Sequence, residues 1–93
     1  MESIVKDGVI MQNTAFGVQG LIMKEDKVLL LFKSNGDLDL SGGRTEDGES
    51  LTEGLYREIF EETGLEVKIV DPFIQWSFIR DPELLVTGMT YYC

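Results

Sequence analysis

Histidine is absent from this chain of 93 residues, and Cys93 is its only cysteine. An internal disulfide is therefore excluded, as are catalysis by histidine and the common zinc sites built from cysteine and histidine. Proline occurs only twice and no segment is of low complexity, which excludes a collagen-like or linker-like chain. No apolar run approaches the ~18 residues that cross a bilayer, and the N-terminus lacks a secretory signal. We therefore expect one domain in the cytoplasm.

Positive charge is scarce as well. Eight lysine and arginine residues stand against 17 acidic residues, and the formal net charge is −9. Such a surface repels the phosphates of nucleic acids and anionic lipids, so we expect neither polymeric nucleic acid nor a membrane as a partner. An acidic chain can still act on phosphates where a divalent cation bridges the two. The positions of the acids therefore matter more than their number.

The hydrophobic pattern predicts strands on both sides of one helix. Strands are expected at 14–23, 27–33, 65–70, 73–79 and 84–93, with a short extended segment at 38–40. The first two strands are expected to form a hairpin whose second strand is largely buried. This order predicts an α+β fold with one helix laid on a mostly antiparallel or mixed sheet. Because the chain halts inside the last predicted strand, we expect a fragment, or a chain that a partner completes.

The helix has clear signals at both ends. Ser50 and Glu53 form a Ser-x-x-Glu capping box, and Gly64 supplies a C-terminal stop. One broad face is apolar and contains Leu51, Leu55, Tyr56, Ile59 and Phe60.

Three acids gather near the end of this helix. Glu58, Glu61 and Glu62 share one face at spacings of three and four residues, where like charges oppose each other by a few tenths of a kcal/mol. The helix macrodipole disfavours the last two by roughly 0.3–1 kcal/mol each. A hard divalent cation would relieve both penalties, whereas the alternative is an ordinary solvated acidic face. Gly54, one turn earlier, either leaves room for an ion or substrate or packs closely against a strand.

Two further features surround these acids. Arg57 lies four residues from both Glu53 and Glu61, so it forms a local ion pair, orients a catalytic carboxylate, or does both. Gly42 and Gly43 form either a simple tight turn or a segment whose backbone carbonyls approach whatever the helix binds, because no Cβ intervenes.

Residues 43–65 resemble the Nudix box, the signature of the Nudix (MutT-like) hydrolase family. The box reads Gly, five residues, Glu, seven residues, then Arg-Glu-apolar-x-Glu-Glu-x-Gly-apolar. All nine constrained positions are filled over 23 residues: Gly43, Glu49, Arg57, Glu58, Ile59, Glu61, Glu62, Gly64 and Leu65. A chance match of this length is far less common than that of a short glycine motif.

The resemblance implies an α/β/α sandwich with a mixed sheet. It covers residues 1–93 as a single Nudix domain, about two-thirds of the usual one, apparently without the C-terminal strand and helix portion. One sheet face and some strand edges would then be open, so we expect either a longer protein or a homo-oligomer that completes the sandwich.

The implied activity is hydrolysis of the pyrophosphate bond of a nucleoside diphosphate linked to another moiety, with Mg²⁺ or Mn²⁺ as cofactor. Glu58, Glu61 and Glu62 would bind the metal, and one of them could activate the attacking water. Gly42 matches the family's backbone-carbonyl ligand. Which nucleotide derivative is cleaved stays open: a dinucleotide, a sugar nucleotide, ADP-ribose or an oxidised triphosphate.

Other positions would support this site. Arg57 and Glu49 match the family's structural ion pair, which orients the loop and the catalytic helix, while Gly43 and Gly64 keep the backbone of the box in shape. The family usually has proline before the two glycines, where this chain has Ser41.

Basic and aromatic side chains are candidates for substrate contacts. Arg44 and Lys33 either contact phosphates or are surface charges. Phe73, Trp76 and Phe78 either stack on a base or pack in the core.

Two alternatives to an enzyme stay open. The chain could be a nucleotide-binding Nudix module or an inactive truncated fragment, or a structural fragment whose acidic helix has no catalytic role.

Overall fold

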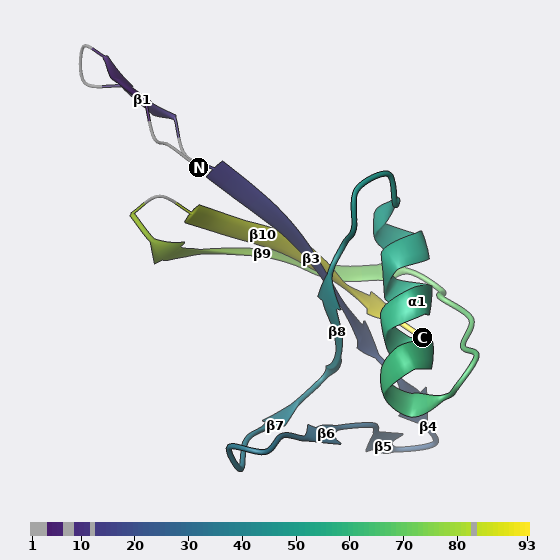
Figure 1. The fold of residues 1–93 in the computed structure, drawn as a ribbon. Coiled ribbons are helices and arrows are strands. Elements are labelled where there is room, and N and C mark those ends of the chain that lie inside the picture. Colours follow the sequence, from purple (N-terminus) through teal and green to yellow (C-terminus); the bar gives the residue numbers. More distant parts are fainter. Residues whose placement is uncertain (1–3, 7–8, 12, 83) are drawn as a thin grey trace.

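The computed structural model describes residues 4–6, 9–11, 13–82 and 84–93. Its main sheet has four strands in the order β8–β3–β10–β9 (Figure 1). These strands are β3 (Asn13–Leu21), β8 (Ser41–Arg44), β9 (Pro72–Asp81) and β10 (Leu84–Tyr92). β10 runs parallel to β3 and antiparallel to β9, and β8 runs antiparallel to β3. The predicted mixed sheet of an α+β fold is therefore confirmed.

Six shorter strands form three antiparallel pairs. They are β1 (Ile4–Lys6) with β2 (Val9–Met11), β4 (Met23–Lys24) with β5 (Lys27–Val28), and β6 (Leu31–Phe32) with β7 (Leu38–Asp39). The pair β1–β2 extends away from the sheet in Figure 1.

The predicted hairpin of 14–23 with 27–33 is wrong in its main part. β3 takes β8 and β10 as its neighbours, and only the two residues of β4 pair with β5. The second segment is also not buried, since 40% of Val28 and 78% of Phe32 are exposed. The apolar residues of 27–33 are typical of a central strand. The long parallel partner of β3 is instead β10, from the other end of the chain.

The helix α1 (Leu51–Thr63) begins and ends as predicted. The Ser50 side chain accepts a hydrogen bond from the Glu53 N–H, and the Glu53 side chain accepts one from the Ser50 N–H, at 3.2 and 3.0 Å. Gly64 has the left-handed φ of 72°, which glycine adopts without strain, and its N–H donates to the Phe60 carbonyl.

The core lies between α1 and the sheet. Leu55 and Ile59 are fully buried and pack with Val18 of β3. The buried helix face is narrower than predicted, because Tyr56 and Phe60 are 43% and 56% exposed. Both occur on the apolar side of the helical wheel, but neither belongs to the buried cluster between α1 and the sheet.

The strand predicted at 65–70 is wrong. Residues 64–71 form an irregular connection along the helix (Figure 1). Val67 and Ile69 are half-buried and pack against the core, and the Ile69 N–H donates to the Tyr56 hydroxyl at 3.2 Å. The alternating pattern arises from packing on the core rather than from a strand ladder.

β9 is an edge strand that leaves large apolar side chains exposed. Phe73, Ile74, Phe78 and Ile79 are 52–64% exposed. Association of chains at the open part of the sheet stays a prediction. Among the described residues, no helix is long and apolar enough to span a membrane.

Candidate active site

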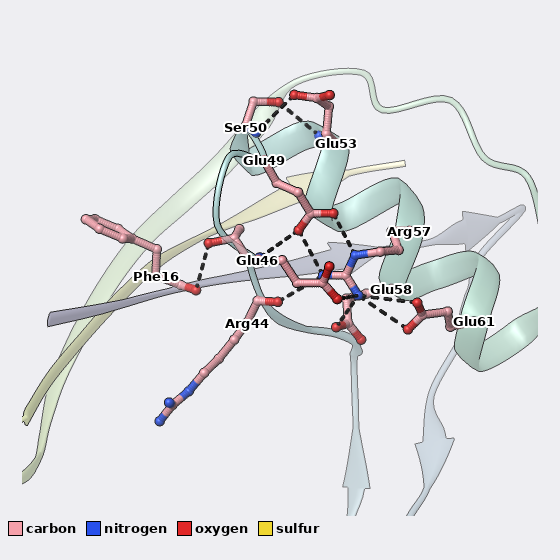
Figure 2. Close-up of polar contacts among 10 residues, drawn as sticks. Phe16, Arg44, Glu46, Glu49, Ser50, Glu53, Arg57, Glu58 and Glu61 are labelled. Atoms are coloured by element: carbon pink, nitrogen blue, oxygen red, sulfur yellow. Dashed lines mark hydrogen bonds and ion pairs between the residues drawn. The ribbon is translucent and has the colours of Figure 1, made fainter.

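The guanidinium of Arg57 joins α1 to the loop that precedes it, residues 45–50, which we call the box loop. Arg57 donates from Nε to Glu49 Oε2 at 2.6 Å and from Nη2 to Glu49 Oε1 at 2.9 Å (Figure 2). Nη2 also donates to the Arg44 carbonyl at 3.1 Å, and the Glu46 N–H donates to Glu49 Oε1 at 2.7 Å. These hydrogen bonds, with that from Arg57 the largest influence, lower the pKa of Glu49 to about 2. The ion pair implied for Arg57 and Glu49 is thus present, and it ties the loop to the helix.

The low pKa of Glu49 predicts a specific acid sensitivity. Between its ordinary pKa of 4.5 and about 2, the unfolded chain binds a proton that the folded chain does not, so stability falls as the pH drops through this window. We expect Glu49→Gln to melt at a lower temperature than wild type at pH 7 and to lose part of the pH dependence between about 5 and 2. Melting curves at several pH values measure this, and identical pH profiles for the two proteins would contradict it.

Glu58 is the most enclosed acid of the trio. Its Oε1 accepts from Arg57 Nη1 at 2.9 Å, and its side chain is 18% exposed. A Cβ placed on Gly43 would lie 2.7 Å from the Glu58 carboxyl carbon, so the glycine leaves the space that this carboxylate uses. Gly43 therefore brings strand β8 directly against Glu58.

Glu61 faces outward. Its side chain is 56% exposed and lies 3.3 Å from Arg57 Nη1. The local ion pair expected of Arg57 is therefore present with Glu61, whereas Glu53 is engaged in the helix cap. Figure 2 shows the Arg57 guanidinium between the carboxylates of the loop and those of the helix.

Glu62 lies against the start of β8. Its Oε1 accepts from Ser41 Oγ and from the Gly42 N–H, both at 2.8 Å. Ser41 is fully buried. The structure thus brings Glu58 and Glu62, one helical turn apart, against the backbone of Gly42 and Gly43.

The donor chemistry of this place suits a divalent cation. Carboxylate and backbone carbonyl oxygens are the ligands that Mg²⁺ and Mn²⁺ prefer. Within the described part of the chain, no three acidic or cysteine side chains are grouped closely enough to hold one ion. Glu58 and Glu61 pair with Arg57, whereas Glu62 is hydrogen-bonded to β8. The type of donor nevertheless fits, and Gly43 lets the Glu58 carboxylate approach the backbone of β8. Glu58, Glu61, Glu62 and Gly42 therefore stay the proposed ligands.

A groove of about 320 Å³ runs from this place across the sheet. Glu62, Gly42 and Gly43 line it together with Lys33 and Asp39. Lys33 Nζ lies 2.9 Å from Asp39 Oδ2, and their hydrogen bond raises the pKa of Lys33 and lowers that of Asp39. The groove is thus lined by an ion pair as well as by Glu62.

Two aromatic side chains, Trp76 and Phe78, also line the groove. The Trp76 ring lies over Gly17 and Gly88, where an added Cβ would come within 2.9 and 2.6 Å of it. Trp76 Nε1 donates to Thr90 Oγ1 at 3.1 Å, and the Phe78 ring lies 6.1 Å away with an interplanar angle of 19°. Gly17 and Gly88 therefore leave the space in which the Trp76 ring lies, and the hydrogen bond to Thr90 fixes its orientation.

Two candidates take other places. The Arg44 side chain extends away from the helix carboxylates, although Arg44 also lines the groove (Figure 2). Gly54 is buried, and a Cβ on it would lie 2.9 Å from Thr45 Cγ2, so it serves close packing against the box loop.

Sequence reasoning missed Ser41 and Asp39. Asp39 ends β7 and Ser41 begins β8, just before the box. Their positions depend on the pairing of these strands with β6 and β3. The Asn35-Gly36 turn was a usable signal for Asp39, because it folds the chain back toward Lys33. No local signal pairs Ser41 with a carboxylate 21 residues later.

Comparison with known proteins identifies the family. The model of the NUDIX domain matches residues 11–87. The chain belongs to this family, as its box predicted. The crystal structure of a MutT protein from Methanosarcina mazei Go1 is similar to this chain, with 33% sequence identity and a TM-score of 0.77. The superposition covers 87% of this chain and 63% of that protein.

Two curated relatives are named by activity. The ADP-ribose pyrophosphatase of Methanocaldococcus jannaschii is 44% identical over 59 residues, covering 59% of this chain and 35% of that protein. The oxidized purine nucleoside triphosphate hydrolase of Mus musculus is 32% identical over 71 residues, covering 70% of this chain and 46% of that protein. The chain thus spans less than half the length of either relative.

Proposed function

We propose that the protein is a metal-dependent hydrolase that cleaves the pyrophosphate bond of a nucleoside diphosphate linked to another moiety. The observation that carries the proposal is the complete box folded as one unit, with Arg57 fixing the loop and with Glu58 and Glu62 against the two glycines. The names of the two curated relatives support the same class of substrate.

In the proposed reaction a water oxygen attacks one phosphorus, and the oxygen that bridges the two phosphorus atoms leaves. Glu58, Glu61 and Glu62 would hold the cation, and one of them would accept the proton of the attacking water. Bound Mg²⁺ or Mn²⁺ would supply positive charge against the diphosphate and acidify a water molecule. Arg57 keeps Glu58 and the loop in place. Lys33, which lines the groove and pairs with Asp39, is the proposed contact for phosphate oxygens.

The groove supports a nucleotide as substrate. Glu62, Trp76 and Phe78 line the same groove, and this combination of a carboxylate and aromatic rings suits a molecule with a metal-bound diphosphate and a flat base. The Trp76 ring offers the larger stacking area, with Phe78 beside it.

The decisive experiment is a turnover assay on the longest form of the protein that contains residues 1–93. ADP-ribose, a sugar nucleotide, a dinucleotide and an oxidised purine triphosphate are incubated with Mg²⁺, with Mn²⁺ or with EDTA, and released nucleotide is measured. We expect turnover of at least one compound with metal and none with EDTA. No turnover of any compound would overturn the proposed enzyme.

A binding measurement separates an enzyme from a nucleotide-binding module. Trp76 is the only tryptophan and lines the groove, so its fluorescence reports on an occupied groove. Quenching by a nucleotide that is not cleaved would favour the binding module. Quenching together with turnover is the result that the proposed function requires.

A further inference from the structure

The Ser41 hydroxyl is a buried donor directed at a proposed metal ligand. Ser41 is 0% exposed, and its Oγ lies 2.8 Å from Glu62 Oε1. The Gly42 N–H reaches the same oxygen at 2.8 Å. Two neighbouring residues of β8 therefore hold one atom of a side chain that belongs to the last turn of α1.

This contact opposes an unfavourable local field. A carboxylate in the last turn of a helix faces the negative end of the macrodipole, and α1 has no basic residue in that turn. The two donors are fixed in place, because Ser41 and Gly42 pair with Gly20 and Gln19 of β3. The sheet thus sets the orientation of Glu62 more firmly than the helix does.

The other oxygen of Glu62 is left for a ligand. Among the described residues, Glu62 Oε2 has no hydrogen bond or ion pair, and Glu62 lines the groove beside the two glycines. One donor alone would let the carboxylate pivot about a single contact. Two donors at different angles restrict that rotation, as supporting hydrogen bonds do for metal-binding carboxylates.

We propose that Ser41 is a positioning residue of the metal site, whose hydroxyl fixes Glu62 through Oε1 and leaves Oε2 to the cation. The inference rests on the proposed function, because Glu62 is a metal ligand only there. It assigns a role to a position of this chain that departs from the usual proline of the family pattern.

The test compares Ser41→Ala with Ser41→Thr, which keeps the hydroxyl. Binding of Mn²⁺ to the metal-free protein is measured by electron paramagnetic resonance. We expect Ser41→Ala to bind Mn²⁺ roughly 10- to 100-fold more weakly than wild type and Ser41→Thr to bind more tightly than Ser41→Ala. Thr90→Val is the matched control, since Thr90 is also a buried hydroxyl at 4% exposure but contacts Trp76 and Gln19.

Two further readouts keep the result interpretable. Melting curves without metal show whether each variant is folded, and the carboxyl carbon resonance of Glu62 in NMR spectra reports on loss of the hydrogen bond in the absence of metal. We expect this resonance to move in Ser41→Ala and to stay in place in Thr90→Val.

The possible failures are distinct. Folded Ser41→Ala that binds Mn²⁺ as tightly as wild type would overturn the role of Ser41 and leave the proposed hydrolase standing. Wild-type protein that binds neither Mn²⁺ nor Mg²⁺ would overturn the proposed function itself.

Discussion

Replacing Glu58 with glutamine is expected to lower kcat by about 10²–10³-fold at saturating Mg²⁺, the usual effect of removing one group that stabilises transition-state charge. Glutamine has the size of the native side chain but no charge, so it is a poor cation ligand. Gly43 leaves space for the Glu58 carboxylate, which accepts a hydrogen bond from Arg57 Nη1 at 2.9 Å. The measurement is steady-state turnover of whichever nucleotide the wild type cleaves.

Glu66→Gln is the matched control for this prediction. Glu66 is an exposed acid of the connection after α1. It lines a hollow together with Arg57, but the hydrogen bonds of Glu58, Glu61 and Glu62 go to other residues. The same loss of one negative charge there is expected to leave kcat within about twofold, because an exposed charge beyond the site is largely screened. Equal losses in Glu58→Gln and Glu66→Gln would show that overall charge, rather than the site, sets the rate.

Local signals suffice to predict α1. The cap at Ser50, the reciprocal bond of Glu53 and the positive φ of Gly64 involve residues within a few positions of one another. Pairing of strands is different, because β3 and β10 lie at opposite ends of the chain and meet in parallel. No pattern within either strand specifies that partner, which is why the hairpin of 14–23 with 27–33 is wrong.

The connection after α1 shows a second limit of periodicity. Leu65, Val67 and Ile69 alternate with polar residues, a pattern typical of a half-buried strand. Two of them pack against the core without a ladder of hydrogen bonds. Alternation reports which side chains are buried, and it does not report whether the backbone has a partner.

The candidate site divides in the same way. The box predicts the Arg57–Glu49 ion pair, which the structure contains, and Arg57 also contacts Glu58. The grouping of the three acids around one ion stays a prediction. The surroundings come from distant strands: the Ser41 contact with Glu62, and the two glycines beneath Trp76. A glycine in a strand predicts a close approach, but its neighbour is known only once the sheet is assembled.

Truncating Ile59 to alanine is expected to destabilise the protein by about 2–5 kcal/mol, the usual range for a fully buried aliphatic side chain. Ile59 and Leu55 are the helix residues at 0% exposure, and Ile59 Cδ1 fills the space above Gly20, where a Cβ would lie 3.0 Å away. A protein of this size has roughly 5–15 kcal/mol of stability, so the loss is a large fraction of the total. Urea unfolding followed by circular dichroism measures the change.

Phe60→Ala decides whether burial is the cause. Phe60 is the next residue of the same helix and loses more atoms on truncation, yet it is 56% exposed. We expect the change to be about 1 kcal/mol or less, since most of its surface stays in contact with water in the folded state. If Phe60→Ala were as damaging as Ile59→Ala, the outer side of α1 would have to be covered in solution, and the helix would pack on two sides. If only Ile59→Ala is strongly destabilising, burial of Ile59 against Val18 is the main contact that holds α1 on the sheet. The same contact then keeps the carboxylates of α1 beside β8.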